Sequence, residues 1–407
     1  MGKFLPDPEI ERLVQEMNRL VEREEDEVLS DEDPVAGDLD EPGLQHVVAG
    51  EELERLLTEM ARRKASDLIL VPDSPPVLRI NGRLHRLDGP AVDGEHVRSL
   101  FSPHFGARSR RLLAETGSAD FSIGLARGDL EGGGLRLRVN VQRQGGQMSA
   151  AVRALPQRIP GLGELHLPER LEKLVQPTNG LILVCGPTGS GKSTTLAALL
   201  DHLNRTAFRH VITIEDPVEY EHRNRSSVFE QVEVGRDSLS FSTALRSALR
   251  RDPDVILVGE MRDLETMATA ITAAETGHLI LSTLHTGDVS QAVHRIVDVF
   301  PAAQQGQIRQ QLSLSLAAIV CQQLVPTADG SGRVPALEIL LATYAVRNHI
   351  RRGNLDRLYN ELIGGRSRGM ISMEQSLAEL VQSGSISADE APARSTRPDE
   401  LERMIAG

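Results

Sequence analysis

The run Leu181-Ile-Leu-Val-Cys-Gly-Pro-Thr-Gly-Ser-Gly-Lys-Ser193 decides the fold of this 407-residue chain. Its first five residues, Leu181 to Cys185, are apolar and predict a buried strand, and the residues from Lys192 onward predict a helix. Between them, Gly186 to Ser193 matches the pattern G-x-x-x-x-G-K-[ST] in full, and this pattern requires a strand before it and a helix after it. The sequence therefore predicts a phosphate-binding loop inside an α/β domain.

Each residue type in this loop serves the binding of phosphate groups. Glycines let backbone N–H groups point inward at the phosphates, and the first turn of the following helix adds positive potential. Lys192 is expected to reach the β and γ oxygens of ATP, and Ser193 to bind Mg²⁺. The predicted cofactors are ATP and Mg²⁺, and the predicted binding residues of the loop are Gly186, Pro187, Thr188, Gly189, Ser190, Gly191, Lys192, Ser193 and Thr194.

Three more short apolar runs, 211–214, 255–258 and 279–282, alternate with helical patterns after the loop. Continuous apolar runs of this kind are typical of parallel strands that helices cover on both faces. Glu260 follows the strand 255–258, so it is expected at the carboxyl edge of the sheet, where ligands of such folds bind. We predict that Glu260 activates the water that attacks the γ-phosphate.

Further polar residues adjoin the other strands. Glu215 and Glu219 belong to an acidic loop interrupted by proline, which can support metal or water. His278 and His285 flank the strand 279–282, where an imidazole can sense phosphate or contact a neighbouring subunit. All four side chains are predicted to take part in catalysis.

Composition divides the chain into five expected parts. Residues 1–48 form an acidic extension with one amphipathic helix and a flexible linker, because breakers and acidic residues dominate their second half. Short strands and an Asn-Gly turn predict an α+β domain over 49–155. A proline-rich linker is expected over 156–170, the ATPase core over 171–300, and a mainly helical region over 301–407. Within that last region we expect a helix from Gln304 through Val320 and a short hairpin around Asp329-Gly330.

The overall charge argues against one class of function. The net charge is −13, and fifteen Asp and Glu residues against four Lys and Arg in the first fifty residues account for most of it. An acidic chain argues against a dedicated nucleic-acid binder. The acidic helix near the N-terminus is either a tethered docking peptide for a regulatory partner or a loosely packed extension.

Two cysteines are too few for a disulfide framework or a four-cysteine zinc site, so no zinc is expected. No signal segment and no apolar run long enough to cross a bilayer is present. We therefore expect a cytoplasmic protein, with a peripheral position at the inner face of the membrane remaining open.

Four motifs in this order resemble the secretion-ATPase superfamily, which drives type IV pili and type II secretion. They are the phosphate loop, the aspartate box 213–220, the segment 252–263 and the histidine box 276–286. The resemblance implies a RecA-like core, a smaller PAS-like N-terminal domain and a homohexamer. It also implies that Arg138 and Arg153 contribute positive charge to the nucleotide.

Within the superfamily the chain is most similar to the branch that retracts type IV pili. The segment 345–352 resembles the C-terminal signature of that branch, and its residues Ala345, Arg347, Asn348, Ile350 and Arg351 are candidates for contact with a partner. The resemblance implies ATP hydrolysis coupled to pilin disassembly and twitching motility, through an inner-membrane platform protein.

Some positions depart from the retraction branch. The retraction branch typically has Gln-Arg-Glu where this chain has Gln231-Val-Glu233, which is closer to the assembly and secretion branch. Asn348-His349 replaces the usual Asn-Leu. Pilus assembly or type II secretion therefore remains an alternative function. A nucleotide-binding regulatory scaffold is an alternative of another class, which the presence of Lys192 and Glu260 disfavours.

Overall fold

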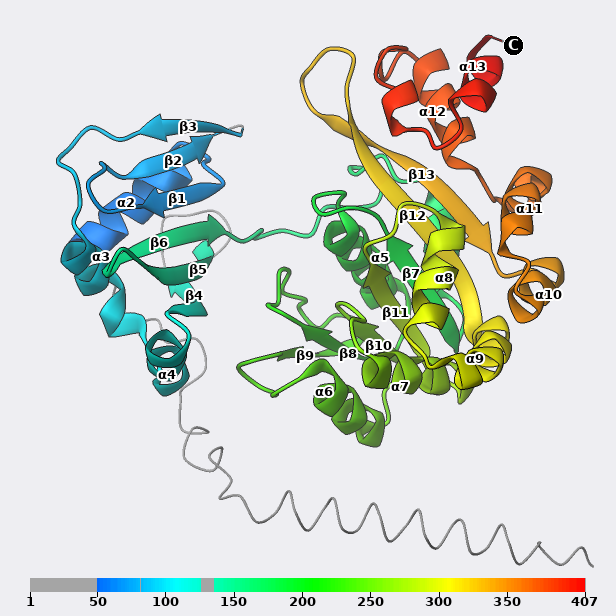
Figure 1. Cartoon of the computed structure of the whole chain (residues 1–407), viewed down its shortest axis with the longest axis horizontal. Coiled ribbons are helices and arrows are strands. Elements are labelled where there is room, and N and C mark those ends of the chain that lie inside the picture. The colour runs from blue at the N-terminus through cyan, green and yellow to red at the C-terminus, as the bar shows by residue number, and fades with distance from the viewer. Residues whose placement is uncertain (1–49, 81, 126–134, 407) are drawn as a thin grey trace, which may run out of the picture. The chain divides into compact units, whose positions relative to one another are not determined.

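The computed structural model describes residues 50–80, 82–125 and 135–406, and the chain forms two compact units, one ending at Leu155 and one starting at Pro156 (Figure 1). The acidic helix expected within residues 1–48 lies outside the described residues. Among the residues described, none of the helices is both long and apolar enough to pass through a lipid bilayer.

The first unit is an antiparallel sheet with helices packed against it. The sheet has the strand order β3-β2-β1-β6-β5-β4. Its helices bury Leu53, Leu57 and Phe101 against the sheet, as the amphipathic spacing of 53, 56, 57 and 60 predicts. The α+β architecture is confirmed. The elements are α2 (Glu51–Arg62), β1 (Asp67–Leu70), β2 (Val77–Ile80), β3 (Arg83–Arg86), α3 (Gly94–Phe101), α4 (Ala107–Glu115), β4 (Ser118–Leu125), β5 (Leu135–Gln144) and β6 (Gln147–Ala154).

The second unit is built on a seven-stranded sheet with the order β13-β12-β7-β11-β10-β8-β9. All neighbouring strands are parallel except β12 and β13. The apolar runs that predict parallel strands are wholly buried in β7, β10 and β11, and the RecA-like core is confirmed. The strands are β7 (Gly180–Cys185), β8 (His210–Glu215), β9 (Val228–Glu233), β10 (Val255–Val258), β11 (Leu279–Leu284), β12 (Leu316–Pro326) and β13 (Arg333–Leu341).

Helices cover both faces of this sheet, as Figure 1 shows. Helix α5 packs on one face through Leu196, Leu199 and Leu200, and α6 to α9 pack on the other. Alternate residues of each strand supply the two cores, so the sheet is buried on both sides. These helices are α5 (Lys192–Thr206), α6 (Phe241–Ala248), α7 (Leu264–Glu275), α8 (Val289–Asp298) and α9 (Ala302–Ser315).

The C-terminal part differs from the mainly helical region that the sequence predicts. The expected helix ends at Ser315, and Leu316–Val320 begins β12 instead. This short run is apolar enough to be either element, and pairing with β7 on one side and β13 on the other buries it in the sheet. The hairpin around Asp329-Gly330 is present and joins two long strands. The helices that follow are α10 (Tyr344–Arg352), α11 (Leu358–Gly364), α12 (Met373–Gln382) and α13 (Pro398–Ala406).

Two expected boundaries also need correction. The segment 156–170 is not a free linker, because Leu162 and Leu167 are buried in the same apolar cluster as α5. Residue 300 does not separate two compact units either, since 156–407 forms one. The reason is the β12–β13 hairpin, which extends the sheet of the ATPase core.

Candidate nucleotide site

The phosphate loop lies between β7 and α5, and two of its glycines have no substitute. Gly186 has φ +145°, and a Cβ there would lie 2.3 Å from the carbonyl oxygen of Gln322 and 2.6 Å from Ser190 Oγ. Gly191 has φ +89°, and its Cβ would lie 2.9 Å from Gln322 Nε2. Any side chain at these positions would strain the backbone and displace a packed neighbour. The close approach of β12 to the phosphate loop therefore requires glycine at both positions.

The loop has unsatisfied polar groups that fit a bound phosphate. Gly191 precedes α5 in a left-handed conformation and gives the helix no side-chain cap among the described residues. Ser190 Oγ is buried without a hydrogen-bond partner in that same part of the chain. Uncapped amides at a helix N-terminus favour anions. These observations fit the β- and γ-phosphates of a nucleotide.

Lys192 folds back onto this loop. Its Nζ donates to the carbonyl oxygens of Gly186 at 2.9 Å and Pro187 at 3.1 Å, and the residue is 9% exposed. Burial lowers the pKa of Lys192 below its usual value, while the nearby charges of Cys185, Glu219 and Glu260 oppose that shift. The lysine is thus a partly desolvated cation close to Glu219 and Glu260, two of the three carboxylates that the sequence predicts for catalysis.

Glu260 stands just beyond β10 with its side chain only 17% exposed. Its Oε1 accepts from Arg262 Nε at 2.7 Å, and His285 Nε2 lies 3.9 Å from its Oε2. Burial lowers the pKa of His285, and the charge of Lys192 lowers it further. The three side chains, together with Arg295 and Thr283, line a pocket of about 280 Å³. Glu260 therefore has a cavity beside it that water can enter.

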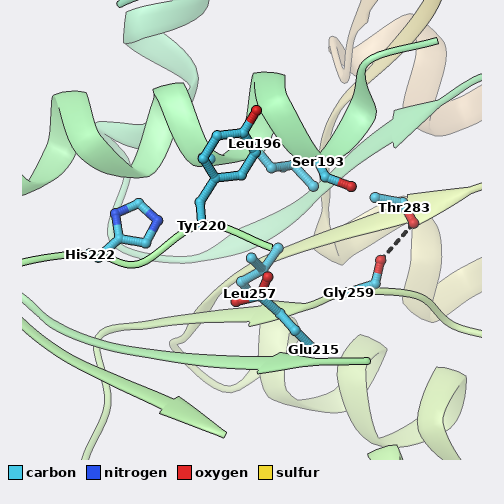
Figure 2. A pocket seen from close by; sticks show the side chains of 9 residues that line it. Ser193, Leu196, Glu215, Tyr220, His222, Leu257, Gly259 and Thr283 are labelled. Carbon is cyan, nitrogen blue, oxygen red and sulfur yellow. Dashed lines mark hydrogen bonds between the residues drawn. The ribbon is translucent and has the colours of Figure 1, made fainter. Parts of the chain in front are cut away.

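The aspartate box closes over the first turn of α5. Tyr220 and Thr194 share a hydrogen bond of 3.0 Å between their hydroxyl groups. Ser193, Tyr220, Glu215 and Thr283 line a cavity of about 30 Å³, room for about one water molecule, and Figure 2 shows them around it. The aspartate box thus contacts Thr194, the residue next to Ser193, the predicted Mg²⁺ ligand.

Glu215 and Glu219 both lie at this site. Burial raises the pKa of Glu215 to about 7, and hydrogen bonds from Thr213 and Gln231 oppose the shift. Glu219 is close enough for its charge to raise the pKa of both Lys192 and Glu215. The structure therefore brings Glu215, Glu219 and Glu260 together around the phosphate loop, as their positions at the carboxyl ends of strands predict.

Strand β9 holds the aspartate box in place. Gln231 Nε2 donates to the Tyr220 carbonyl at 2.9 Å, and Gln231 Oε1 accepts from His222 N at 2.8 Å. Two residues further on, Glu233 Oε2 accepts from Val218 N at 3.1 Å. Val232 lies between them and packs against the apolar core. The polar residues of Gln231-Val-Glu233 therefore position the loop.

The structure does not bring His278 to these residues. His278 precedes β11, and its Nδ1 lies 3.1 Å from the carbonyl oxygen of Ala273 at the end of α7. His285 follows the same strand, whose six residues span roughly 20 Å. His285 thus lies beside Glu260, and His278 lies at the far end of the strand, because residues that flank one strand are separated by its whole length. Only His285 thus lies beside Glu260, and a part of His278 in catalysis stays a prediction.

Arg138 and Arg153 belong to the first unit, where they face each other across β5 and β6. Arg153 Nε lies 2.8 Å from Asp67 Oδ1, and Arg138 Nε lies 3.5 Å from Asp120 Oδ1. The side chain of Arg153 is 68% exposed and that of Arg138 is 41% exposed. Both are thus accessible members of surface ion pairs, and their contribution to nucleotide binding stays a prediction.

The residues of the C-terminal signature lie on α10. Arg347 donates to the carbonyl oxygens of Ala342, Ser313 and Leu314, the last two in the final turn of α9. Ile350 is completely buried. By contrast, Arg351 is exposed and donates to Asn348. Arg347 and Ile350 therefore join two helices of this chain, and their candidacy for partner contact, with that of Ala345, Asn348 and Arg351, stays a prediction.

Gln322 is a residue of this site that the sequence did not point to. It lies on β12, is 3% exposed, and hydrogen-bonds with Ser190 and Thr195. No motif includes it, because it lies 132 positions after Ser190 and just beyond the helix predicted to end at Val320. The pair Gln322-Gln323 inside an otherwise apolar strand is the one signal that the sequence offered.

Comparison with known proteins explains this combination of loop, acidic residues and strand order. The model of the type II/IV secretion system protein family matches residues 151–396. This chain belongs to that family. The Pseudomonas aeruginosa type IV pilus retractation ATPase PilT is 42% identical over 350 residues, which are 86% of this chain and the whole of that relative.

Two further proteins are similar to this chain over most of its length. A twitching motility protein of Neisseria gonorrhoeae is 42% identical, covering 80% of this chain and 86% of the relative. A crystal structure of the pilus retraction motor PilT with bound ADP is 45% identical, with a TM-score of 0.78, covering 86% of this chain and 98% of that one. The family fold thus extends over both units of the described chain.

Proposed function

We propose that this chain is an ATP-hydrolysing motor that retracts type IV pili by removing pilin subunits from the base of the fibre. The observation that carries the proposal is that Glu260, Lys192 and Glu219 lie together beside the phosphate loop. The loop leads into α5, whose N-terminus has no side-chain cap among the described residues. The retraction ATPase and the twitching motility protein that resemble this chain over most of its length support the direction of the motor.

The site residues suggest how hydrolysis proceeds. Glu260 accepts a proton from the attacking water, whose oxygen bonds to the γ-phosphorus while the bond to the bridging oxygen breaks, so that ADP and phosphate form. Lys192 leaves the loop carbonyls and neutralises charge on the β and γ oxygens. Arg262 holds the Glu260 carboxylate in place. Mg²⁺, bound through Ser193, would stabilise negative charge on the same oxygens.

The assembly in which the motor works is part of the same proposal. A homohexamer at the inner face of the cytoplasmic membrane, acting on an inner-membrane platform protein, would convert hydrolysis into movement of the pilus base. The ADP bound to the similar retraction motor supports ATP and ADP as the nucleotides of this chain. The acidic residues 1–48 would provide a contact for a regulatory partner.

A deletion of the gene tests the direction of the motor. Cells that lack the protein should carry excess pili and fail to twitch, and a copy encoding Lys192→Ala should not restore twitching. Cells without pili would indicate an assembly motor instead. If Lys192→Ala restored twitching fully, the chain would act as a scaffold and not as an ATPase.

A further inference from the structure

Gln322 lies directly beside the phosphate loop, although it is 132 positions from its loop partner Ser190 in the sequence. Strands β12 and β7 are parallel neighbours, and Cys321 is in register with Cys185. The residues that follow these cysteines are Gln322 and Gly186, so the glutamine is level with the first glycine of the loop. Its backbone oxygen occupies the space that a Cβ at Gly186 would need.

The side chain of Gln322 hydrogen-bonds to both the phosphate loop and the first turn of α5. Its Nε2 donates to the Ser190 carbonyl at 2.7 Å, and its Oε1 accepts from Thr195 Oγ1 at 2.8 Å. Gln322 and its two partners, Ser190 and Thr195, are each at least nine-tenths buried. A buried amide with both ends bonded is rigid, because breaking either bond leaves a polar group without water.

The bond to Ser190 has a consequence for the nucleotide. In a trans peptide the C=O and the following N–H point in opposite directions. Holding the Ser190 carbonyl on the side of Gln322 therefore turns the N–H of Gly191 away from β12, toward the interior of the loop. That amide belongs to the uncapped N-terminus of α5.

We propose that Gln322 is a positioning residue for the phosphates of the bound nucleotide. It fixes the Ser190–Gly191 peptide and the first turn of α5 so that their amides are oriented before a nucleotide arrives. Because the amides need no reorientation on binding, the glutamine increases affinity without touching the ligand. This inference rests on the proposed nucleotide-binding function.

The chain offers a matched control in the next residue. Gln323 is of the same type, lies on the same strand, and points to the other face, where its Nε2 donates to the Arg394 carbonyl at 3.2 Å. Replacing either glutamine by Met removes one amide at similar volume. A loss of strand stability would affect both variants, whereas loss of loop geometry would affect Gln322→Met alone.

The experiment measures the affinity of the full chain for ADP by calorimetry, together with the unfolding temperature without nucleotide. We expect Gln322→Met to weaken ADP binding about tenfold, because a buried carbonyl and a buried hydroxyl lose their partners. Gln323→Met should bind ADP like the wild type. Gln322→Asn keeps an uncharged amide and shortens the side chain by one methylene, so it cannot reach Ser190 and Thr195 together and should also weaken binding.

Three results would decide against this inference. ADP binding by Gln322→Met at wild-type affinity would overturn it, and so would an equal loss in Gln323→Met. Should Gln322→Met fail to fold, the uncharged Gln322→Asn decides in its place, and wild-type affinity there contradicts the proposal. A wild-type chain that binds no ADP would refute the proposed function itself, which the variants alone cannot do.

Discussion

The hydroxyl groups of Tyr220 and Thr194 share a hydrogen bond of 3.0 Å, which ties the aspartate box to the first turn of α5. Thr194 follows Ser193, the residue that we propose as a ligand of Mg²⁺. The bond therefore connects the loop that carries Glu219 with the helix that carries the phosphate-binding amides.

Removing this bond should weaken catalysis moderately. Tyr220→Phe keeps the buried ring and deletes one hydroxyl, so we expect a loss of about 1 kcal/mol, or roughly fivefold in kcat/KM for ATP hydrolysis. Steady-state kinetics at saturating Mg²⁺ measures it. Tyr344→Phe is the matched control, because Tyr344 is 83% exposed on α10. Equal rates for Tyr220→Phe and the wild type would mean that the bond does not matter for turnover.

Glu260→Gln should abolish turnover and retain ATP binding. The amide cannot accept the proton of the attacking water, and loss of a general base costs about 100-fold or more in rate. Phosphate release and ATP affinity are measured on the same preparation. Glu265→Gln, at the start of α7 in an exposed ion pair with Arg246, is the control and should hydrolyse ATP normally. Rapid hydrolysis by Glu260→Gln would refute the proposed mechanism.

Glu338 should make the protein less stable as the pH rises through neutrality. Burial raises the pKa of Glu338 to about 7, with Asp288 and Glu374 adding to the shift. The folded state thus binds more protons than the unfolded state between about pH 4.5 and 7, so stability falls as the pH rises across that window. Above about pH 7 the buried carboxylate of Glu338 is charged in the folded state, so the full cost of its desolvation lowers the free energy of unfolding.

Glu338→Gln tests this pH dependence. Its Oε1 can still accept from Val289 N, as Glu338 does at 2.9 Å, and the amide carries no charge. The unfolding temperature of the variant relative to the wild type should increase steadily from pH 5 to pH 8. A constant difference over that range would show that Glu338 does not titrate there.

Arg347→Ala should destabilise the junction of α9 and α10. The guanidinium satisfies carbonyl groups at the end of α9, and its loss should cost about 1 kcal/mol in the free energy of unfolding. Urea denaturation measures this cost. Arg351→Ala, on the exposed side of α10, should leave stability unchanged. If Arg351→Ala abolished twitching while keeping stability and hydrolysis, α10 would have an exposed partner surface beside its structural residues.

Local patterns sufficed for the parts of the site that lie close together in sequence. The loop 186–193 follows its strand and opens its helix, and Glu260 follows β10, so strand direction alone brings them to one edge of the sheet. The same reasoning was incomplete for the histidines, because His278 and His285 lie at opposite ends of β11.

Long-range pairing accounts for what the sequence did not reveal. The run Leu316–Val320 has no period that separates a helix from a buried strand, and only its pairing with β7 settles the choice. Gln322 became part of the site through that same pairing. Val232, which distinguishes Gln231-Val-Glu233 from the retraction pattern, packs against the core, so this substitution leaves the contacts of Gln231 and Glu233 with the aspartate box intact.

The pairing of β12 with β7 also limits how the enzyme can be shortened. A fragment that stopped at Phe300, where the sequence suggested the core would end, would leave one whole side of β7 without a neighbour. Exposed backbone groups on an apolar strand invite association between chains. The smallest fragment with an intact phosphate loop must therefore continue at least through Pro326, the end of β12, so that the strand that carries the loop stays in the interior of the sheet.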